Sequence, residues 1–520
     1  MDKSYTKSKK ERNPQKRFKK YLSCWKKTDG YMTFLASMLF LAVSALLFIC
    51  LDGSLLYQAK SRVAMAQTGL SEHLLANYNV PLAQRYHLYF LDPRMNQTVL
   101  EEKGEEYYEE LFKGSSGWLN APSSFWRIST EYLEAVPFGN MQEKEFQFFI
   151  TQIEDYMKYD LTKDLLMKTL GEAIQETEKQ STQMEETVNN LNKNDSAGNS
   201  STGENTLTPS EVAQGEQADR EIQKKNPLQK IQSILEYGVL GIVADESGLS
   251  ERKIASSLLP FKNQKESKIT LSMDVLKGLD EIEELIKNQN LDELTDGLTR
   301  QGAINLYIQK YFNYYGKPEQ IENTELLYEM EYILGGQNSD KENLEYVVNR
   351  LVLLRFALNA SYAFGNEELR AQALSLAAVL TGITGTPEFI EPVRYIILAA
   401  VNLIESVMDV NELLEGEKVP LIKTTADWKT SVNGAAKENL QRNKGLNYQE
   451  YTLMLLTLQT DLEKKCCRMQ NLMEINIRRE EPEFQIRECR AGIGLRTGVK
   501  VKPIFVLKDY LLEKEQKVTY

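Results

Sequence analysis

The stretch that decides the fold is Tyr31–Leu51, YMTFLASMLFLAVSALLFICL, a run of 21 residues without a charged side chain. A helix of about 20 apolar residues is long enough to cross the roughly 30 Å hydrocarbon core of a bilayer. A cleaved signal peptide has a shorter apolar region, of about 7–15 residues, that ends at a small-x-small site. The nearest such pattern, Ala64-Met65-Ala66, lies well beyond Leu51. We therefore predict one transmembrane helix over residues 31–51.

The charges on the two sides of this segment predict its orientation. Residues 1–30 hold eleven Lys or Arg and three acidic residues, a net charge of +8, whereas the whole 520-residue chain has a net charge of −12. Basic residues beside a span favour the cytoplasmic side. We expect a cytoplasmic N-terminal tail and an extracytoplasmic domain of 469 residues after Leu51, held at the cell membrane. The acidic surplus of this outer part opposes nucleic-acid binding, which needs a surplus of Lys and Arg.

The rest of the chain divides into segments of distinct composition and periodicity. Apolar residues continue at helical spacing from Leu55 to Leu74, with Pro81 as the expected stop. A segment poor in large apolar residues and rich in Ser, Asn and Gly cannot offset the entropy of ordering it. We predict these divisions: a basic tail at 1–30, the span at 31–51, a helical rod and stalk at 52–191 with a weak heptad over 170–191, a disordered low-complexity loop at 192–226, a helical globular head with short strands at 227–480, and a C-terminal β-hairpin and tail at 481–520.

Within the head, periodicity predicts mostly helices with a small β element, so the expected fold class is α+β. Ser339-x-x-Glu342 is typical of a helix N-terminal capping box. The alternation of Tyr328, Met330 and Tyr332 with glutamates predicts a strand. The expected elements are strands at 327–334 and 419–431, helices at 366–382, 389–415 and 446–479, and a hairpin whose runs 484–490 and 498–507 flank the turn sequence AGIGLRT.

The sequence contains few of the residues and motifs that catalysis usually requires. Only two histidines occur, His73 and His87, and we expect them to make local hydrogen bonds. No phosphate-binding loop, zinc-protease helix, nucleophile elbow or CxxC motif is present. We therefore expect no enzymatic activity, no cofactor and no metal site.

Two acidic pairs are candidates for chemistry. Glu329 and Glu331 share one face of the predicted strand, where they form either an acid/base pair or, as we favour, a solvated or Lys/Arg-paired face between aromatic neighbours. Glu405 and Asp409 lie one turn apart in an apolar helix, so they form either a metal site or, as we favour, a core ion pair with Arg350 or Arg355.

Three cysteines lie in the predicted outer part, namely Cys466, Cys467 and Cys489. Adjacent cysteines rarely bond to each other without strain. One disulfide from Cys466 or Cys467 to Cys489 is therefore a hypothesis for an oxidising compartment.

Several segments resemble known families. The opening DGYMTFLASMLFLAVSALLFICLDGSLLYQAKSRVAMAQ with LLANYNVPLAQRYHLYFLD is similar to the N-terminal anchors of TadE/TadG-like pseudopilins. The segments NPLQKIQSIL, LLYEMEYILGGQNSDKENL, ESVMDVNELLEGEKVPLIK and YQEYTLMLLTLQTDLEKKCCRMQNLMEINI resemble domain of unknown function 5702, a family of Clostridia-type bacteria associated with Tad (Flp) pili.

The resemblance implies a minor pseudopilin or an assembly scaffold of a Tad/Flp-like type IV pilus or secretion apparatus. Its partners would be the lipid bilayer, other pilin-like subunits, pilus platform proteins and a prepilin peptidase. Family prepilins are cut after a Gly that precedes the apolar helix, which makes Gly30 and Tyr31 the candidate processing site. They commonly carry Glu five residues later, where this chain has Leu35.

Two other functions remain open from the sequence. A membrane-anchored sensory or adhesive ectodomain is the main alternative to a structural component. A cell-envelope hydrolase that uses Glu329 and Glu331 is the weakest of the three.

Overall fold

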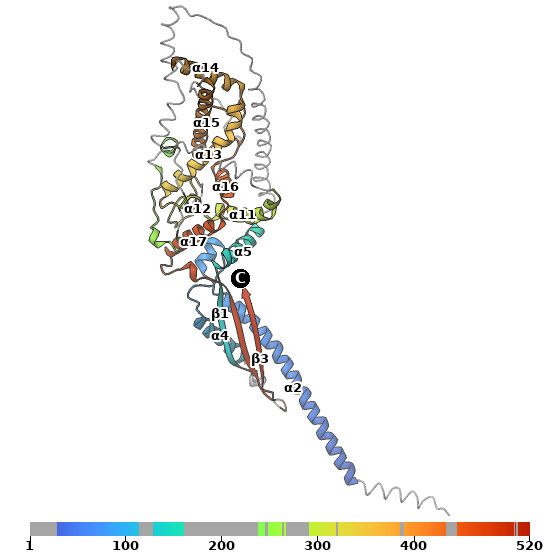
Figure 1. The fold of residues 1–520 in the computed structure, drawn as a ribbon. Helices are drawn as coiled ribbons and strands as arrows, with labels where there is room; N and C mark the ends of the chain where they lie inside the picture. The colour runs from blue at the N-terminus through green and yellow to red at the C-terminus, as the bar shows by residue number, and fades with distance from the viewer. Residues whose placement is uncertain are drawn as a thin grey trace, which may run out of the picture. The chain divides into compact units, whose positions relative to one another are not determined.

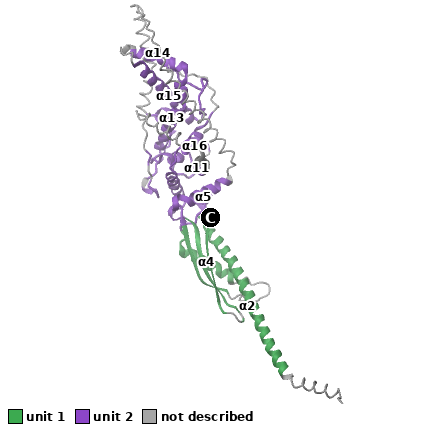
Figure 2. Cartoon of the chain, turned by 45° about the vertical axis from the view of Figure 1, so that its right-hand side comes forward, with its two compact units in different colours: residues 1–78, 94–138, 490–520 green, residues 79–93, 139–489 purple. Residues whose placement is uncertain are grey.

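The structure is a computed structural model that describes residues 29–113, 128–160, 238–244, 248–262, 265–266, 291–318, 321–384, 389–432, 445–503, 505 and 508–520. These residues are mostly helical, with one small antiparallel sheet, which confirms the α+β class (Figure 1). The chain divides into two compact units, which Figure 2 shows in different colours. Unit 1 comprises residues 1–78, 94–138 and 490–520, and unit 2 comprises residues 79–93 and 139–489.

Unit 1 is organised around one long helix, α2, which runs without interruption over Asp29–Leu75 (47 residues). The predicted continuation of the span into a helical rod is thus present in the structure. Pro81 does not end this helix. It lies in the first turn of α3, Val80–Tyr86, which belongs to unit 2. A missing N–H removes no helical hydrogen bond there, and the Asn79 side chain caps that turn by accepting from the Leu82 N–H at 3.0 Å.

The remainder of unit 1 is helix α4, Gln97–Lys113, and a sheet of three strands in the order β1-β2-β3. Strand β2 pairs antiparallel with β3, so that Gly492 lies opposite Thr519 and Val501 lies opposite Tyr510. Strand β1 falls inside the region that we predicted as rod and stalk, and that prediction was wrong there. The strands span Ile128–Asn140 (β1), Arg490–Val501 (β2) and Tyr510–Thr519 (β3).

The C-terminal hairpin is present, but its turn was misplaced by the sequence prediction. The AGIGLRT segment lies inside β2, and the connection falls between Val501 and Tyr510. Two glycines of β2 allow close packing and do not form a turn: a Cβ on Gly492 would lie 2.2 Å from the Val518 carbonyl oxygen, and a Cβ on Gly498, which follows the segment, would lie 2.2 Å from the Tyr132 ring of β1. Phe138 lies beside Gly492, so β1 runs opposite to β2.

Unit 2 is helical. Helices α13, α14 and α15 pack around an apolar cluster that includes Ala373, Ile397 and Trp428. The predicted helices at 366–382 and 389–415 are confirmed as α14 and α15, and Ser339 caps α13 by accepting from the Glu342 N–H. The elements are α5 (Glu143–Asp160), α9 (Leu240–Val243), η3 (Ser256–Leu258), α11 (Leu291–Tyr311), α12 (Glu329–Gly335), α13 (Asp340–Gly365), α14 (Glu367–Thr384), α15 (Ile390–Leu414), α16 (Tyr448–Leu458), α17 (Leu462–Arg478) and η5 (Ile486–Glu488).

Three local predictions in unit 2 were wrong. The predicted strand at 327–334 is the short helix α12, because the glutamates and the aromatic residues are both buried and the alternation marks no exposed face. The segment 419–431 is irregular and contains only isolated bridge residues, of which Val419 pairs with Leu446. The predicted helix at 446–479 is two helices, α16 and α17, because Asp461 caps a new helix start by accepting from the Lys464 N–H.

Some predictions fall outside the described residues. These are most of the basic tail at 1–30, the heptad over 170–191 and the low-complexity loop at 192–226.

Candidate functional site

The first candidate site is the N-terminal half of α2. Each residue from Tyr31 to Leu51 is exposed except Ser44, which is partly buried, and Phe40 is 74% exposed. This half projects beyond the sheet in Figure 1. In the described part of the chain, α2 is the one helix long and apolar enough to cross a membrane. The helix therefore carries an uncovered apolar surface that suits association with a lipid bilayer.

Both serines on this surface form hydrogen bonds within the helix itself. The hydroxyl of Ser37 donates to the Phe34 carbonyl at 2.8 Å, and the hydroxyl of Ser44 donates to the Leu41 carbonyl at 3.0 Å. Hydrocarbon supplies no hydrogen-bond partner, so such internal bonds are what a lipid-facing helix requires.

The C-terminal half of α2 is packed into unit 1. Its buried residues recur at helical spacing and contact β2, β3 and α4. Polar contacts tie the hairpin to this helix: the Asp52 carboxylate accepts from the Phe505 N–H at 3.1 Å, the Tyr520 hydroxyl donates to the Leu75 carbonyl at 2.5 Å, and the Thr497 hydroxyl donates to the Gln67 side-chain carbonyl at 3.5 Å. One rigid helix is thus apolar and uncovered at one end and fixed to a sheet at the other. Its buried residues are Asp52, Ala59, Val63, Ala66, Gln67, Leu70, Ser71 and Leu74.

Both histidines stack on tyrosine rings. The His73 ring lies 5.1 Å from that of Tyr107 in unit 1, and the His87 ring lies 5.0 Å from that of Tyr156 in unit 2. They serve as packing elements of their own units.

The second candidate site, the pair Glu329 and Glu331, is buried, and the prediction of a solvated or Lys/Arg-paired face was wrong. Glu329 is 1% exposed and accepts from the Asn313 N–H at 2.8 Å and the Asn476 amide at 2.6 Å. Glu331 is fully buried and accepts from the Tyr315 N–H at 2.9 Å and from the Tyr448 hydroxyl at 2.7 Å.

Burial raises the pKa of both Glu329 and Glu331 to about 7, because the charged form loses its hydration, while the hydrogen bonds act in the opposite direction. These bonds connect α12 to the segment after α11 and to α16 and α17. The two carboxylates therefore act as internal connectors, and neither lines the pocket described below.

The third candidate site is the pair Glu405 and Asp409, which lies in a buried ion cluster. The Arg355 guanidinium donates to Asp409 at 3.0 Å, which confirms the predicted core ion pair. Arg350 makes no such pair and lies over the Tyr346 ring. The lysines Lys423 and Lys429 were missed by the sequence prediction, because nothing in the segment KTTADWKT marks them as buried. The cluster comprises Arg355, Lys423, Lys429, Glu405, Asp409 and Glu412.

The cluster is electrically balanced, with three cations and three anions. Burial alone would raise the pKa of Asp409, but the charges of Arg355, Lys423 and Lys429 outweigh it and hold that pKa at about 2. Among the described residues, no group of three or more His, Cys, Asp or Glu side chains is placed to hold a metal ion. The geometry is that of a satisfied core network.

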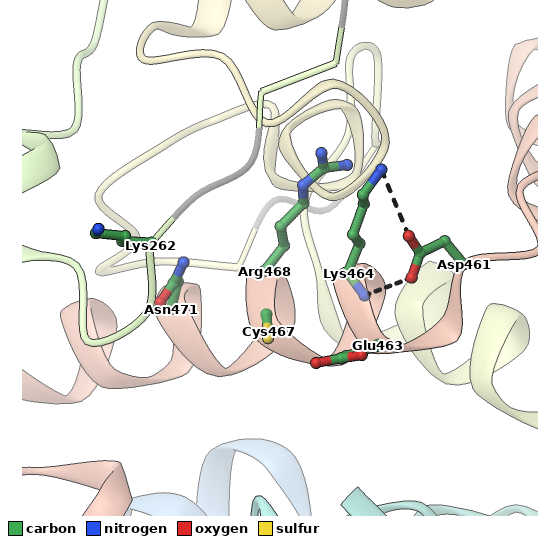
Figure 3. A pocket seen from close by; sticks show the side chains of 7 residues that line it. All are labelled: Lys262, Asp461, Glu463, Lys464, Cys467, Arg468 and Asn471. Atoms are coloured by element: carbon green, nitrogen blue, oxygen red, sulfur yellow. Dashed lines mark hydrogen bonds and ion pairs between the residues drawn. The ribbon is translucent and has the colours of Figure 1, made fainter. Parts of the chain in front are cut away.

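The fourth candidate site is a pocket of about 100 Å³ at the N-terminal end of α17 (Figure 3). Arg468 and Lys464 rise from one face of the helix in Figure 3, and Glu463 points away from it. The Arg468 guanidinium already donates to the carbonyls of Ile333 and Leu334 and to Glu266, and Lys464 pairs with Asp461 and Glu266. The lining residues are Lys262, Asp461, Glu463, Lys464, Cys467, Arg468 and Asn471.

The cysteine of this pocket is a poor nucleophile. Burial, with a contribution from nearby acidic groups, raises the pKa of Cys467 to about 11, and burial also raises that of Cys466. Cys466, Cys467 and Cys489 are free thiols in the structure. The disulfide from Cys466 or Cys467 to Cys489 stays a prediction, which thiol alkylation with and without reductant tests.

The candidate processing site lies at the start of α2. This helix begins at Asp29, so that Gly30 and Tyr31 fall in its first turn. Cleavage between them stays a prediction.

The comparisons with known proteins give one match. The model of a family of unknown function, DUF5702, matches residues 217–501. No curated protein and no solved structure matches the chain.

Proposed function

Since this chain belongs to the DUF5702 family, which carries no established function, we propose that it is a structural component of a Tad/Flp-like type IV pilus or secretion apparatus. It acts there as a minor pseudopilin or as an assembly scaffold. One membrane helix anchors it, with the N-terminus in the cytoplasm and the large domain outside. Its partners are the bilayer, pilin-like subunits and platform proteins.

The observation that carries this proposal is the division of α2 into two halves. The half at 31–51 exposes its apolar side chains, whereas the half that begins at Asp52 buries one face against the sheet and α4. The exposed apolar surface of residues 31–51 must be shielded from water. Lipid shields it before assembly, and the apolar helices of other subunits shield it in a filament. Because the other half of α2 packs against the sheet, the sheet is attached directly to the membrane helix.

The internal use of charged groups supports an assembly role over a catalytic one. Glu329, Glu331 and Asp409 are all buried and engaged in hydrogen bonds or ion pairs within unit 2. Such contacts fix helices to each other. The three carboxylates that make them are not accessible to a substrate as an acid or a base.

Processing after Gly30 would make Tyr31 the first residue and leave the whole apolar half in the mature protein. Because Leu35 replaces the usual Glu, a minor subunit or a membrane-held scaffold suits the chain better than a repeating major subunit. The size of the outer domain supports the same choice.

The test is chemical cross-linking in native membranes, followed by purification of the full chain and identification of the attached proteins. We expect pilin-like subunits, platform proteins or both. As a control, residues 31–51 are replaced by a leucine helix of equal length, which keeps the anchor but removes the specific helix surface. Capture of no pilus or platform component by the native chain would contradict the proposal and favour a sensory or adhesive ectodomain.

A further inference from the structure

Three described residues of the connection between β2 and β3, namely Lys502, Phe505 and Lys508, form what we call the hairpin tip. Of these, Phe505 lies against the end of the apolar segment of α2. The Phe505 ring stacks on the Phe48 ring, with centroids 4.9 Å apart and planes 14° apart. The Phe505 N–H donates to the Asp52 carboxylate at 3.1 Å. These two contacts are one helical turn apart, so they fix the hairpin tip along the helix as well as around it.

The position of Phe48 sets the depth that the tip reaches. Phe48 lies three residues before Leu51, the last residue of the uncharged run, which corresponds to about 5 Å along a helix. Interfacial segments bury their apolar side chains by roughly 5–10 Å at the boundary of headgroups and acyl chains. When residues 31–51 occupy the hydrocarbon, the Phe505 ring therefore lies at interfacial depth.

The surface of the tip has the composition of an interfacial segment. Phe505 is 49% exposed although it stacks on Phe48, and Tyr510 is 50% exposed at the start of β3. Aromatic side chains are enriched at this level of a bilayer. Lys502 and Lys508 are exposed on either side of Phe505, while Lys500 pairs with Asp509 at 3.5 Å. The tip thus combines an aromatic residue with an excess of positive charge.

The tip also covers a carboxylate at the membrane boundary. Asp52 is fully buried although it follows directly on the exposed Leu51. A charged group beside hydrocarbon is costly unless it is hydrogen-bonded and covered. The hairpin therefore permits an acidic residue at this depth.

We propose that the β2–β3 hairpin tip is a second membrane contact, in which Phe505 enters the interface beside α2 while Lys502 and Lys508 bind anionic lipid headgroups. The inference rests on the proposed function, because it requires residues 31–51 to span the bilayer. The contact fixes the angle between the sheet and the membrane, which a single helix alone leaves free.

The experiment places a photo-cross-linking benzoylphenylalanine at one position of the full chain, reconstituted in vesicles of phosphatidylglycerol and phosphatidylcholine. Lipid adducts are then measured by mass spectrometry. The label replaces Phe505 in the test protein, Phe40 in the middle of the span, or Val136, which is 46% exposed on β1 near Gly494 and away from the tip. We expect lipid adducts from Phe505 and Phe40 and none from Val136.

Charge variants test the lipid preference. In the Phe505-labelled protein, the double substitution Lys502→Gln and Lys508→Gln should lower the yield of phosphatidylglycerol adducts, because each lysine near the surface contributes about fivefold to anionic-lipid binding. The matched control is Lys517→Gln, an exposed lysine opposite Gly494 on the same hairpin, which should leave the yield unchanged.

The outcomes separate the two proposals. Lipid adducts from Phe40 but none from Phe505, or only protein cross-links from Phe505, would overturn the second membrane contact and leave the anchor intact. An unchanged yield in the Lys502 and Lys508 double variant would overturn the preference for anionic headgroups. No lipid adducts from Phe40 would overturn the anchor itself, and with it the proposed function.

Discussion

The substitution Arg355→Met removes the most connected cation of the buried ion cluster. The Arg355 side chain is fully buried and donates to Asp409, Asn359 and the Tyr451 hydroxyl at 3.0, 2.7 and 2.7 Å. It also donates to two backbone carbonyls, those of Pro420 and Leu421, at 3.0 and 3.1 Å. Methionine fills a similar volume but makes none of these bonds.

The expected loss of stability follows from this geometry. Removing one partner of a buried ion pair costs about 3–5 kcal/mol, because the other charge stays buried. Lys423 and Lys429 still face Asp409, which places the expected loss near the lower limit, at about 3 kcal/mol. With a urea dependence of about 2 kcal/mol per molar, the unfolding midpoint should fall by about 1.5 M.

The assay is urea unfolding of the full chain in detergent, followed by tryptophan fluorescence. Trp428 reports on this region, since it is buried and lies under Lys423. The control is Arg479→Met, which removes an arginine that bonds to Glu325 at 2.8 Å with its side chain 43% exposed. An exposed pair contributes less than about 1 kcal/mol, so this variant should unfold close to the native midpoint.

Two results would refute the reasoning about the cluster. The first is an Arg355→Met midpoint that falls no further than that of Arg479→Met. The second concerns the double variant with Asp409→Asn, which restores charge balance and should lose less than the sum of the single losses. Strict additivity would show that the two side chains do not act as a pair.

Two further predictions concern pH and backbone packing. The pKa of Glu329 and Glu331 is about 7 in the folded protein and about 4.5 when unfolded. Between these two pH values the folded state therefore binds more protons than the unfolded state. The free energy of unfolding is thus highest near pH 4.5 and falls by roughly 3 kcal/mol per group as the pH rises to 7. Urea midpoints measured across this window should decline in the native chain and flatten in the Glu329→Gln, Glu331→Gln double variant; a native midpoint that rises with pH would contradict this. Gly498→Ala should cost about 1–3 kcal/mol in thermal unfolding, since its Cβ would meet the Tyr132 ring, whereas Gly494→Ala, whose Cβ has its nearest contact at 3.6 Å, should cost less. Equal losses would disprove the close-packing role of Gly498.

The sequence predicted those parts of the fold that depend on local pattern. The uncharged run at 31–51 and its helical continuation indicated one long helix, and apolar spacing identified α14 and α15. The ion pair between Arg355 and Asp409 could be predicted because an acidic pair in an apolar helix requires a nearby cation.

The errors arose where tertiary contacts decide the structure. Residues 327–334 alternate like a strand, but the partners of Glu329 and Glu331 come from segments far along the chain, and these bury both carboxylates on a helix. The AGIGLRT segment of β2 was interpreted as a turn because its pairing with β3, for example of Gly492 with Thr519, is invisible in the local sequence. The stacking of Phe505 on Phe48 likewise joins residues that only the folded sheet brings together.

The most direct test of the central claim is the N-terminal sequence of the mature protein isolated from native membranes. We expect a terminus at Met1, for a permanently anchored scaffold, or at Tyr31, for a processed pseudopilin, with the apolar half of α2 retained in both cases. A mature N-terminus beyond Leu51, in a protein released from the membrane, would show that residues 31–51 are a cleaved signal and would contradict a membrane-anchored assembly component.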